Sequence, residues 1–140
     1  MTLVFLGWTD AERVAAVWEA AGGAAPEGRA PPLLAPAGLV GVPRRRPRLV
    51  ALDLSDEGGR AAALQRAVAD SLAAAALHEP ERRPFWPHLT LARLRKGARW
   101  RPLEGVLALE PFHATAITLY RSHLSQSGGR YEALHRHPLG

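Results

Sequence analysis

Two stretches show the spacing of an amphipathic helix, in which apolar residues recur every three or four positions. The first covers residues 14–21, where Val14, Val17, Trp18 and Ala21 share one face. It follows a capping box at Thr9–Glu12, and Gly22–Gly23 end it. The second is long and alanine-rich, starts at Ala61 and ends near Leu77.

Alternating or short apolar runs between turn residues predict the strands. We expect strands over Thr2–Gly7, Leu49–Leu54 and Phe112–Arg121, and a hairpin partner over Arg130–His137 after a turn at 125–129. The proline-rich stretch 24–47 predicts a loop with at most one edge strand, at around 39–42, because proline cannot donate to a ladder. Together the elements predict an α+β fold, a mainly antiparallel sheet with outer helices.

The stretch F-W-P-H-L-T-L-A-R, residues 85–93, combines a strand pattern with groups that can bind an anion. Pro87 favours an extended backbone before it, and Leu89 and Leu91 then alternate with His88 and Thr90. An imidazole, a hydroxyl and the Arg93 guanidinium can therefore meet one small anion beside the sheet. The competing interpretation makes His88 an ordinary strand histidine, Thr90 a plain β-former and Arg93 a surface residue.

Length and composition bound the class of protein. The 140 residues fit one domain or two small lobes with a common core, and the absence of cysteine excludes disulfides and thiolate metal sites. No apolar run is long enough to span a bilayer and no signal peptide is evident, so we expect a cytoplasmic protein without membrane contact. The net charge of +5 comes mostly from arginine and favours an anionic partner, although a GC-rich genome explains the same composition.

Three further features have a bland and a functional interpretation each. Arg44–Arg46 is a solvated turn or a contact for RNA backbone, and Trp100 covers the edge of the core or stacks on a base. His135 and His137 lie on one face of a strand, but no further ligands with zinc spacing accompany them, so we expect no metal site. No Walker-type glycine loop and no G-x-S-x-G elbow is present.

The string at 85–93 resembles the second signature of the two-histidine phosphoesterases, in particular the RNA 2′,3′-cyclic phosphodiesterases, also called 2′-5′ RNA ligases. The opening M-T-L-V-F-L-G is similar to their first motif, H-x-T-L-x-F-L-G, and the C-terminal L-Y-R-S-x-L and G-x-x-Y-E-x-L runs are similar to their last hairpin. The first motif's histidine falls directly before Met1, so we expect an N-terminus truncated before that histidine, without the strand and helix that precede it. Either translation begins further upstream, or the chain lacks the first motif's histidine.

This resemblance implies a two-lobed α+β fold within one domain over residues 1–140. Residues 1–47 would hold the remainder of the first repeat and a proline-rich connection, and residues 48–140 the second repeat and the C-terminal hairpin. It also implies hydrolysis of RNA 2′,3′-cyclic phosphate ends to 2′-phosphomonoesters by a monomer without metal or cofactor.

The resemblance assigns a role to each candidate site residue. His88 would be the general base, the upstream histidine the general acid, Thr2 and Thr90 hydroxyl donors to the phosphate, and Arg93 a substrate-binding charge. The partner would be RNA or a nucleotide with a cyclic phosphate end. The alternatives are an RNA-end-binding protein without catalysis, and 2′-5′ ligation by the same residues.

Overall fold

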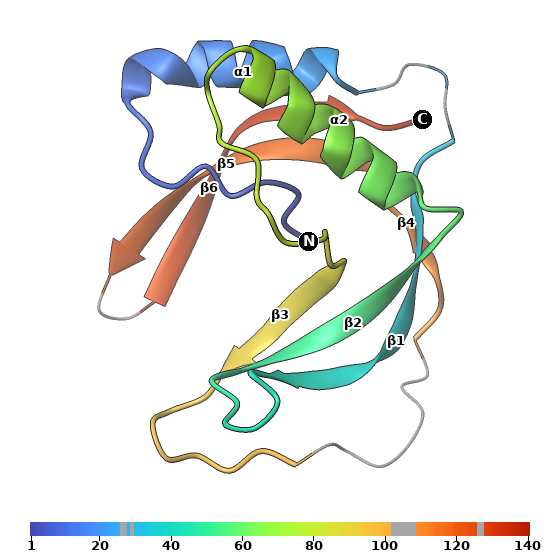
Figure 1. The fold of residues 1–140 in the computed structure, drawn as a ribbon, viewed down its shortest axis with the longest axis vertical. Coiled ribbons are helices and arrows are strands. Elements are labelled where there is room, and N and C mark those ends of the chain that lie inside the picture. The colour runs from blue at the N-terminus through green and yellow to red at the C-terminus, as the bar shows by residue number, and fades with distance from the viewer. Residues whose placement is uncertain (26–27, 29, 102–108, 126–127) are drawn as a thin grey trace.

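In the residues that the structure describes, two antiparallel sheets and two α-helices make up the fold (Figure 1). The structure is a computed structural model that describes residues 1–25, 28, 30–101, 109–125 and 128–140. This architecture confirms the predicted α+β class with antiparallel sheets. No helix in these ranges has the length and apolar content to cross a membrane.

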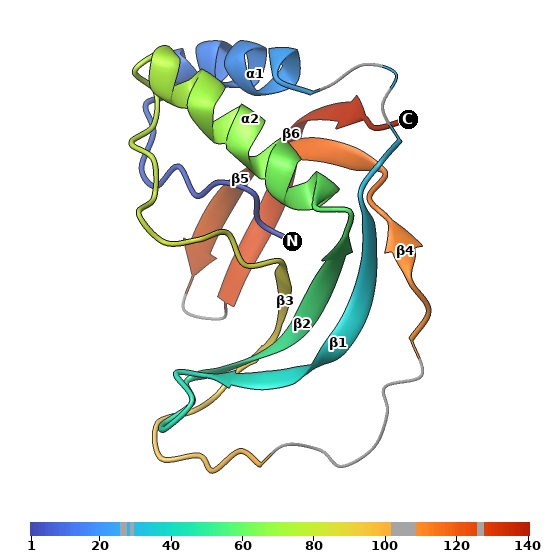
Figure 2. The ribbon, with the colours of Figure 1, turned by 45° about the vertical axis from the view of Figure 1, so that its right-hand side comes forward.

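The larger sheet has the strand order β3-β2-β1-β4 and is strongly curved (Figure 2). Its strands are β1 (Leu33–Val42), β2 (Leu49–Glu57), β3 (His88–Arg93) and β4 (Phe112–His113). Both faces of β2 are buried, since Val50, Ala51, Leu52 and Leu54 are all in the core. The predicted strands at 49–54 and 88–93 are thereby confirmed, and β2 extends three residues further.

The smaller sheet is the hairpin of β5 (Ala116–Ser125) and β6 (Gly128–Pro138). A short 3₁₀ turn (Ala11–Arg13) leads into α1 (Val14–Gly23), and α2 (Arg60–Ala74) packs against α1. Both helices and the hairpin's C-terminal strand match the predicted elements. Two residues of the predicted hairpin turn, Gln126 and Ser127, lie outside the described residues.

Two apolar clusters hold these layers together. The first joins the helices to β5, and its buried members are Val17, Ala21, Ala25, Leu64, Val68, Leu72 and Ile117. The second joins the larger sheet to the start of α2 through Leu34, Leu52, Leu54 and Ala61. Helix α2 therefore contacts both sheets, and the face of β2 opposite Leu52 and Leu54 carries the candidate site.

The N-terminus of α2 is capped by a side chain from the end of β2. The Asp56 carboxylate accepts hydrogen bonds from the backbone N–H groups of Ala61 and Ala62, at 2.9 and 2.8 Å. These donors have no partner within the helix, and a negative charge is favourable at this end. The cap residue Gly59 has φ +66°, a left-handed conformation that glycine adopts without strain.

We expect Asp56→Ala to lower the free energy of unfolding by about 1–2 kcal/mol, because two helix donors lose their acceptor. Urea denaturation followed by circular dichroism measures the difference. Asp70→Ala, an exposed site on the same helix, is the matched control and should stay within about 0.5 kcal/mol of the wild type. Equal stability of both variants would show that the cap does not contribute.

The N-terminal segment differs from its prediction. Thr2–Gly7 forms no strand, because none of the described strands pairs with it. Leu3, Val4 and Leu6 still pack against the first cluster, whereas Phe5 is exposed. The predicted capping box is also wrong: the N-terminal cap is Asp10, and no side chain bonds to the helix donors there.

Two further stretches differ from their predictions. The stretch predicted as a loop contains the ten-residue β1, which pairs with β2 along its length and with β4 only at Leu33 and Leu34. Pro36 is accommodated because the register shifts between Pro36 and Gly38. The single strand expected over Phe112–Arg121 is divided into β4 and β5, which belong to different sheets.

Candidate active site

Strand β3 carries three of the four predicted site residues and has an extra residue in its middle. Ala51 of β2 pairs with Thr90, but the preceding Val50 pairs with Ala92, so Leu91 is left without a partner. Such a bulge changes the alternation of side chains along the strand. Without it, Arg93 would lie on the opposite face from His88, since the two are five positions apart.

The bulge places His88, Thr90 and Arg93 on one face. Directly paired residues of an antiparallel ladder point to the same side, and the partners of these three are Asp53, Ala51 and Leu49, which alternate along β2. The grouping predicted for the three residues is thus consistent with the ladder, through a bulge that the sequence pattern did not predict. Thr90 and Arg93 are exposed, and His88 is half-buried.

The imidazole of His88 has a defined orientation. Its Nδ1 lies 2.8 Å from the backbone carbonyl oxygen of Trp86. A carbonyl only accepts hydrogen bonds, so Nδ1 carries the proton and donates it. In the neutral ring the other nitrogen, Nε2, therefore has a free lone pair, which is the state that a general base needs.

The N-terminal end of the chain lies near the segment that leads into this strand. Both views place the N-terminal end next to the segment that leads into β3 (Figures 1 and 2). Thr2 is exposed there. The N-terminal end and the segment before β3 are therefore near each other in the fold although they are far apart in the sequence.

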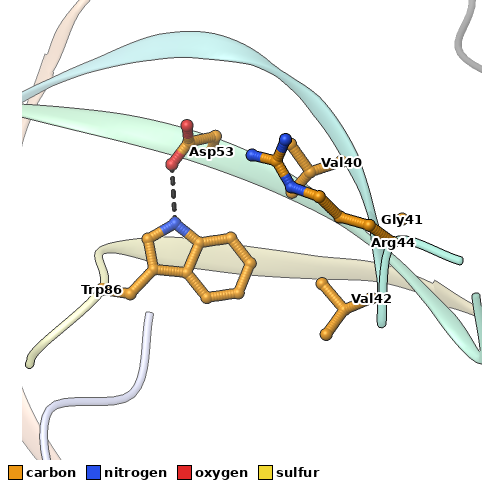
Figure 3. A pocket seen from close by; sticks show the side chains of 6 residues that line it. All are labelled: Val40, Gly41, Val42, Arg44, Asp53 and Trp86. Atoms are coloured by element: carbon orange, nitrogen blue, oxygen red, sulfur yellow. Dashed lines mark hydrogen bonds between the residues drawn. The ribbon is translucent and has the colours of Figure 1, made fainter. Parts of the chain in front are cut away.

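Trp86 and Asp53 also belong to the site, although the sequence did not predict a role for either. Trp86 contacts His88, and Asp53 contacts Trp86. The Trp86 ring stacks on the His88 ring, with centroids 4.1 Å apart and an interplanar angle of 14°. The Trp86 indole Nε1–H donates to Oδ1 of Asp53 at 2.7 Å (Figure 3). A signal for Asp53 existed in the sequence, since it is the one charged residue in the apolar run L-V-A-L-D-L.

A half-open cavity of about 280 Å³ adjoins this pair. Its lining comes from β1, β2, the turn between them and the segment before β3: Val40, Gly41, Val42, Arg44, Asp53 and Trp86 (Figure 3). Arg44 thus lines the cavity, and it is solvent-exposed, as are Arg45 and Arg46 in the same turn. Trp100 lies against Gly41, where an added Cβ would approach its ring to 2.8 Å, which fits the interpretation that it covers the edge of the core.

Two of the other histidines have local partners. His135 stacks on Trp18, with ring centroids 5.2 Å apart. His123 donates a hydrogen bond from Nε2 to the Glu132 carboxylate at 2.8 Å, which holds the pKa of Glu132 below its usual range. In the described ranges, no three His, Asp or Glu side chains come together in a way that would hold a metal ion.

Comparison with known proteins finds several solved structures that are similar to this chain. No protein-family model matches it, and no curated protein sequence does. The protein TT0787 of Thermus thermophilus aligns with 99% of this chain at 31% identity and a TM-score of 0.75, and 76% of TT0787 is covered. A structure described as a phosphoesterase gives 29% identity, a TM-score of 0.72 and coverages of 99% and 75%.

E. coli LigT in complex with NADP⁺ aligns at 27% identity and a TM-score of 0.73, over 99% of this chain and 74% of LigT. The likeness to these proteins extends over both sheets and both helices, because almost the whole chain is aligned. TT0787 and LigT are members of one superfamily. With nearly a third of its residues identical to TT0787 over that length, the chain belongs to the two-histidine phosphoesterase superfamily.

Proposed function

We propose that this protein hydrolyses the 2′,3′-cyclic phosphate ends of RNA to 2′-phosphomonoesters, without a metal ion. The observation that carries the proposal is the hydrogen bond from His88 Nδ1 to the Trp86 carbonyl. It leaves Nε2 available on the face that Thr90 and Arg93 share. A base, a hydroxyl donor and a cation on one strand face match the needs of phosphate ester hydrolysis.

The reaction begins when His88 Nε2 takes a proton from a water molecule that attacks the phosphorus atom. The bond between phosphorus and the 3′ oxygen breaks, and that oxygen must receive a proton as it leaves. By the superfamily pattern the donor is the histidine of the first motif, whose position directly precedes Met1. Two imidazoles suffice for both proton transfers, because each form of histidine is populated near neutral pH.

The remaining residues counter the negative charge that grows on the phosphoryl oxygens. The Arg93 guanidinium neutralises this charge and can bind two oxygens at once. The hydroxyls of Thr90 and Thr2 donate hydrogen bonds to the non-bridging oxygens. Preorganised donors of this kind act mainly on the transition state, where the charge is largest.

The relatives support a nucleotide substrate. LigT has been crystallised with NADP⁺, with 3′-AMP, with ATP and with phosphate, each of which contains a phosphate group. The formal net charge of +5 also favours a polyanionic partner. An RNA strand that ends in a cyclic phosphate combines both properties.

The test measures turnover of an oligoribonucleotide with a 2′,3′-cyclic phosphate end, in excess chelator. It uses the 140-residue chain and the longest product of its gene. We expect a product with a histidine directly before Met1 to form the 2′-phosphate at an unchanged rate after chelation. A folded product with both motifs but without turnover would overturn the proposal, and so would a rate that falls to background in chelator.

Binding of the same oligonucleotide, measured by fluorescence anisotropy, completes the experiment. If a folded product with both motifs binds the oligonucleotide specifically but shows no turnover, the protein is an RNA-end-binding protein and not an enzyme. A 3′-phosphate product would show that the protein is a hydrolase, but it would contradict the proposed cleavage of the bond between phosphorus and the 3′ oxygen.

A further inference from the structure

We propose that Trp86 and Asp53 are positioning residues that hold the His88 imidazole in its reactive orientation. This inference rests on the proposed function in one respect, namely that His88 is the general base. Neither residue needs to touch the substrate for this role. Three contacts carry the argument: the stack of Trp86 on His88, the bond from Trp86 to Asp53, and the bond from His88 to the Trp86 backbone.

Trp86 is not placed as a core residue. Its exposed fraction is 36%, and neither apolar cluster contains it, although Phe85 next to it packs against the second cluster. Tryptophan buries more apolar area than most other side chains when it enters a core. Its position here, flat against an imidazole, therefore indicates a role at the site.

The contacts act on different motions of the imidazole. The hydrogen bond to the Trp86 carbonyl fixes Nδ1, but on its own it leaves the ring free to tilt about that bond. The indole, 4.1 Å away and inclined by only 14°, restricts the ring plane. With both constraints, Nε2 points in one direction on the strand face.

Asp53 fixes the indole in turn. Its carboxylate accepts the indole N–H at 2.7 Å, a short bond to an ionised acceptor (Figure 3). Asp53 is also the direct ladder partner of His88, so it is held by the same backbone as the histidine. The Asp53 carboxylate would repel a phosphate group in direct contact with it. Its hydrogen bond with the indole instead indicates that Asp53 orients Trp86.

The chain contains a matched control for the stack. Trp18 and His135 form a similar pair, at 5.2 Å and 16°, on α1 and β6. This pair belongs to the helix and the hairpin and includes no residue of β3. Loss of Trp18 should reduce stability like any partly buried aromatic residue, but it should not change the His88 ring.

The test combines kinetics with NMR. Trp86→Ala is expected to lower kcat by about 10- to 100-fold with little change in KM, because the base is misdirected while phosphate contacts remain. Asp53→Leu should have a smaller effect in the same direction. The conservative variants Trp86→Phe and Asp53→Asn should keep most of the wild-type rate. The first retains a stacking ring, and the second retains a hydrogen-bond acceptor for the indole.

The NMR arm does not depend on turnover. In the wild type the indole ring current should shift the His88 ring protons upfield, and ¹⁵N spectra should show Nδ1 protonated. Trp86→Ala should remove the upfield shift, Asp53→Leu should reduce it, and Trp18→Ala should leave it intact. If a folded product with both motifs lacks activity but shows these signals, the proposed function fails and the positioning role stands.

Unchanged His88 signals in Trp86→Ala would overturn the inference. So would a loss of kcat that matches only the loss of folded protein, or an equal loss of kcat in Trp18→Ala. Rates are therefore compared at equal folded fractions, which circular dichroism determines for each variant.

Discussion

Replacement of His88 by alanine is expected to lower kcat for cyclic phosphate hydrolysis by about 10²- to 10⁴-fold. The variant loses the lone pair at Nε2 that the bond to the Trp86 carbonyl leaves free. Binding should change far less, because Thr90 and Arg93 remain on the same face of β3. Steady-state kinetics with the cyclic-phosphate oligonucleotide measures kcat and KM separately.

His113→Ala is the matched control for this variant. His113 is an exposed histidine on β4, at the other edge of the larger sheet. Its replacement should leave kcat unchanged. A His88→Ala variant that retains full activity would contradict the assignment of the base, and similar losses in both variants would indicate a general effect of histidine removal.

Leu72→Ala is expected to lower the free energy of unfolding by about 2–5 kcal/mol. Leu72 is only 1% exposed and belongs to the cluster that joins α1, α2 and β5. Truncation removes apolar contacts and leaves a cavity that the two helices fill only in part. Small domains have free energies of unfolding of about 5–15 kcal/mol, so this one substitution removes a large part of the total stability.

Urea denaturation of Leu72→Ala and Leu109→Ala tests this expectation. Leu109 is 54% exposed, and its truncation should change the stability by about 0.5 kcal/mol or less. A Leu72 variant as stable as the Leu109 variant would show that the helices do not depend on this contact.

Elements with a long, regular pattern were predictable from the sequence. Helix α2 repeats an apolar residue on every turn, and Leu64, Val68 and Leu72 of this series are buried as expected. Strand β3 follows from its alternation and from the proline that precedes it. In these elements the local pattern and the tertiary environment favour the same structure.

The elements that differ from prediction depend on partners that the local pattern does not reveal. A proline disfavours a strand only where its missing N–H was needed, and most of β1 has no partner on its second side among the described residues. Thr2–Gly7 shows a strand pattern, but a strand also requires a neighbour with free hydrogen-bonding groups. The alternation over Phe112 to Arg121 predicts one strand, yet the chain passes from one sheet to the other within it.

The candidate site was predictable only where a known motif covers it. His88, Thr90 and Arg93 belong to one contiguous string, whereas Asp53 is 33 positions from Trp86 in the sequence. Their contact follows from the pairing of β2 with β3, which the sequence does not specify. The role of Asp53 could be inferred only from the fold.

The unpaired Leu91 has a consequence for how such strings are searched in other sequences. In a regular strand, residues separated by an even number of positions share a side, and odd separations are discarded as candidates for a common ligand. One inserted residue reverses this parity, so that positions 88 and 93 become neighbours in function. On a strand with one bulge, side chains an odd number of positions apart can therefore bind the same ligand when the bulge lies between them.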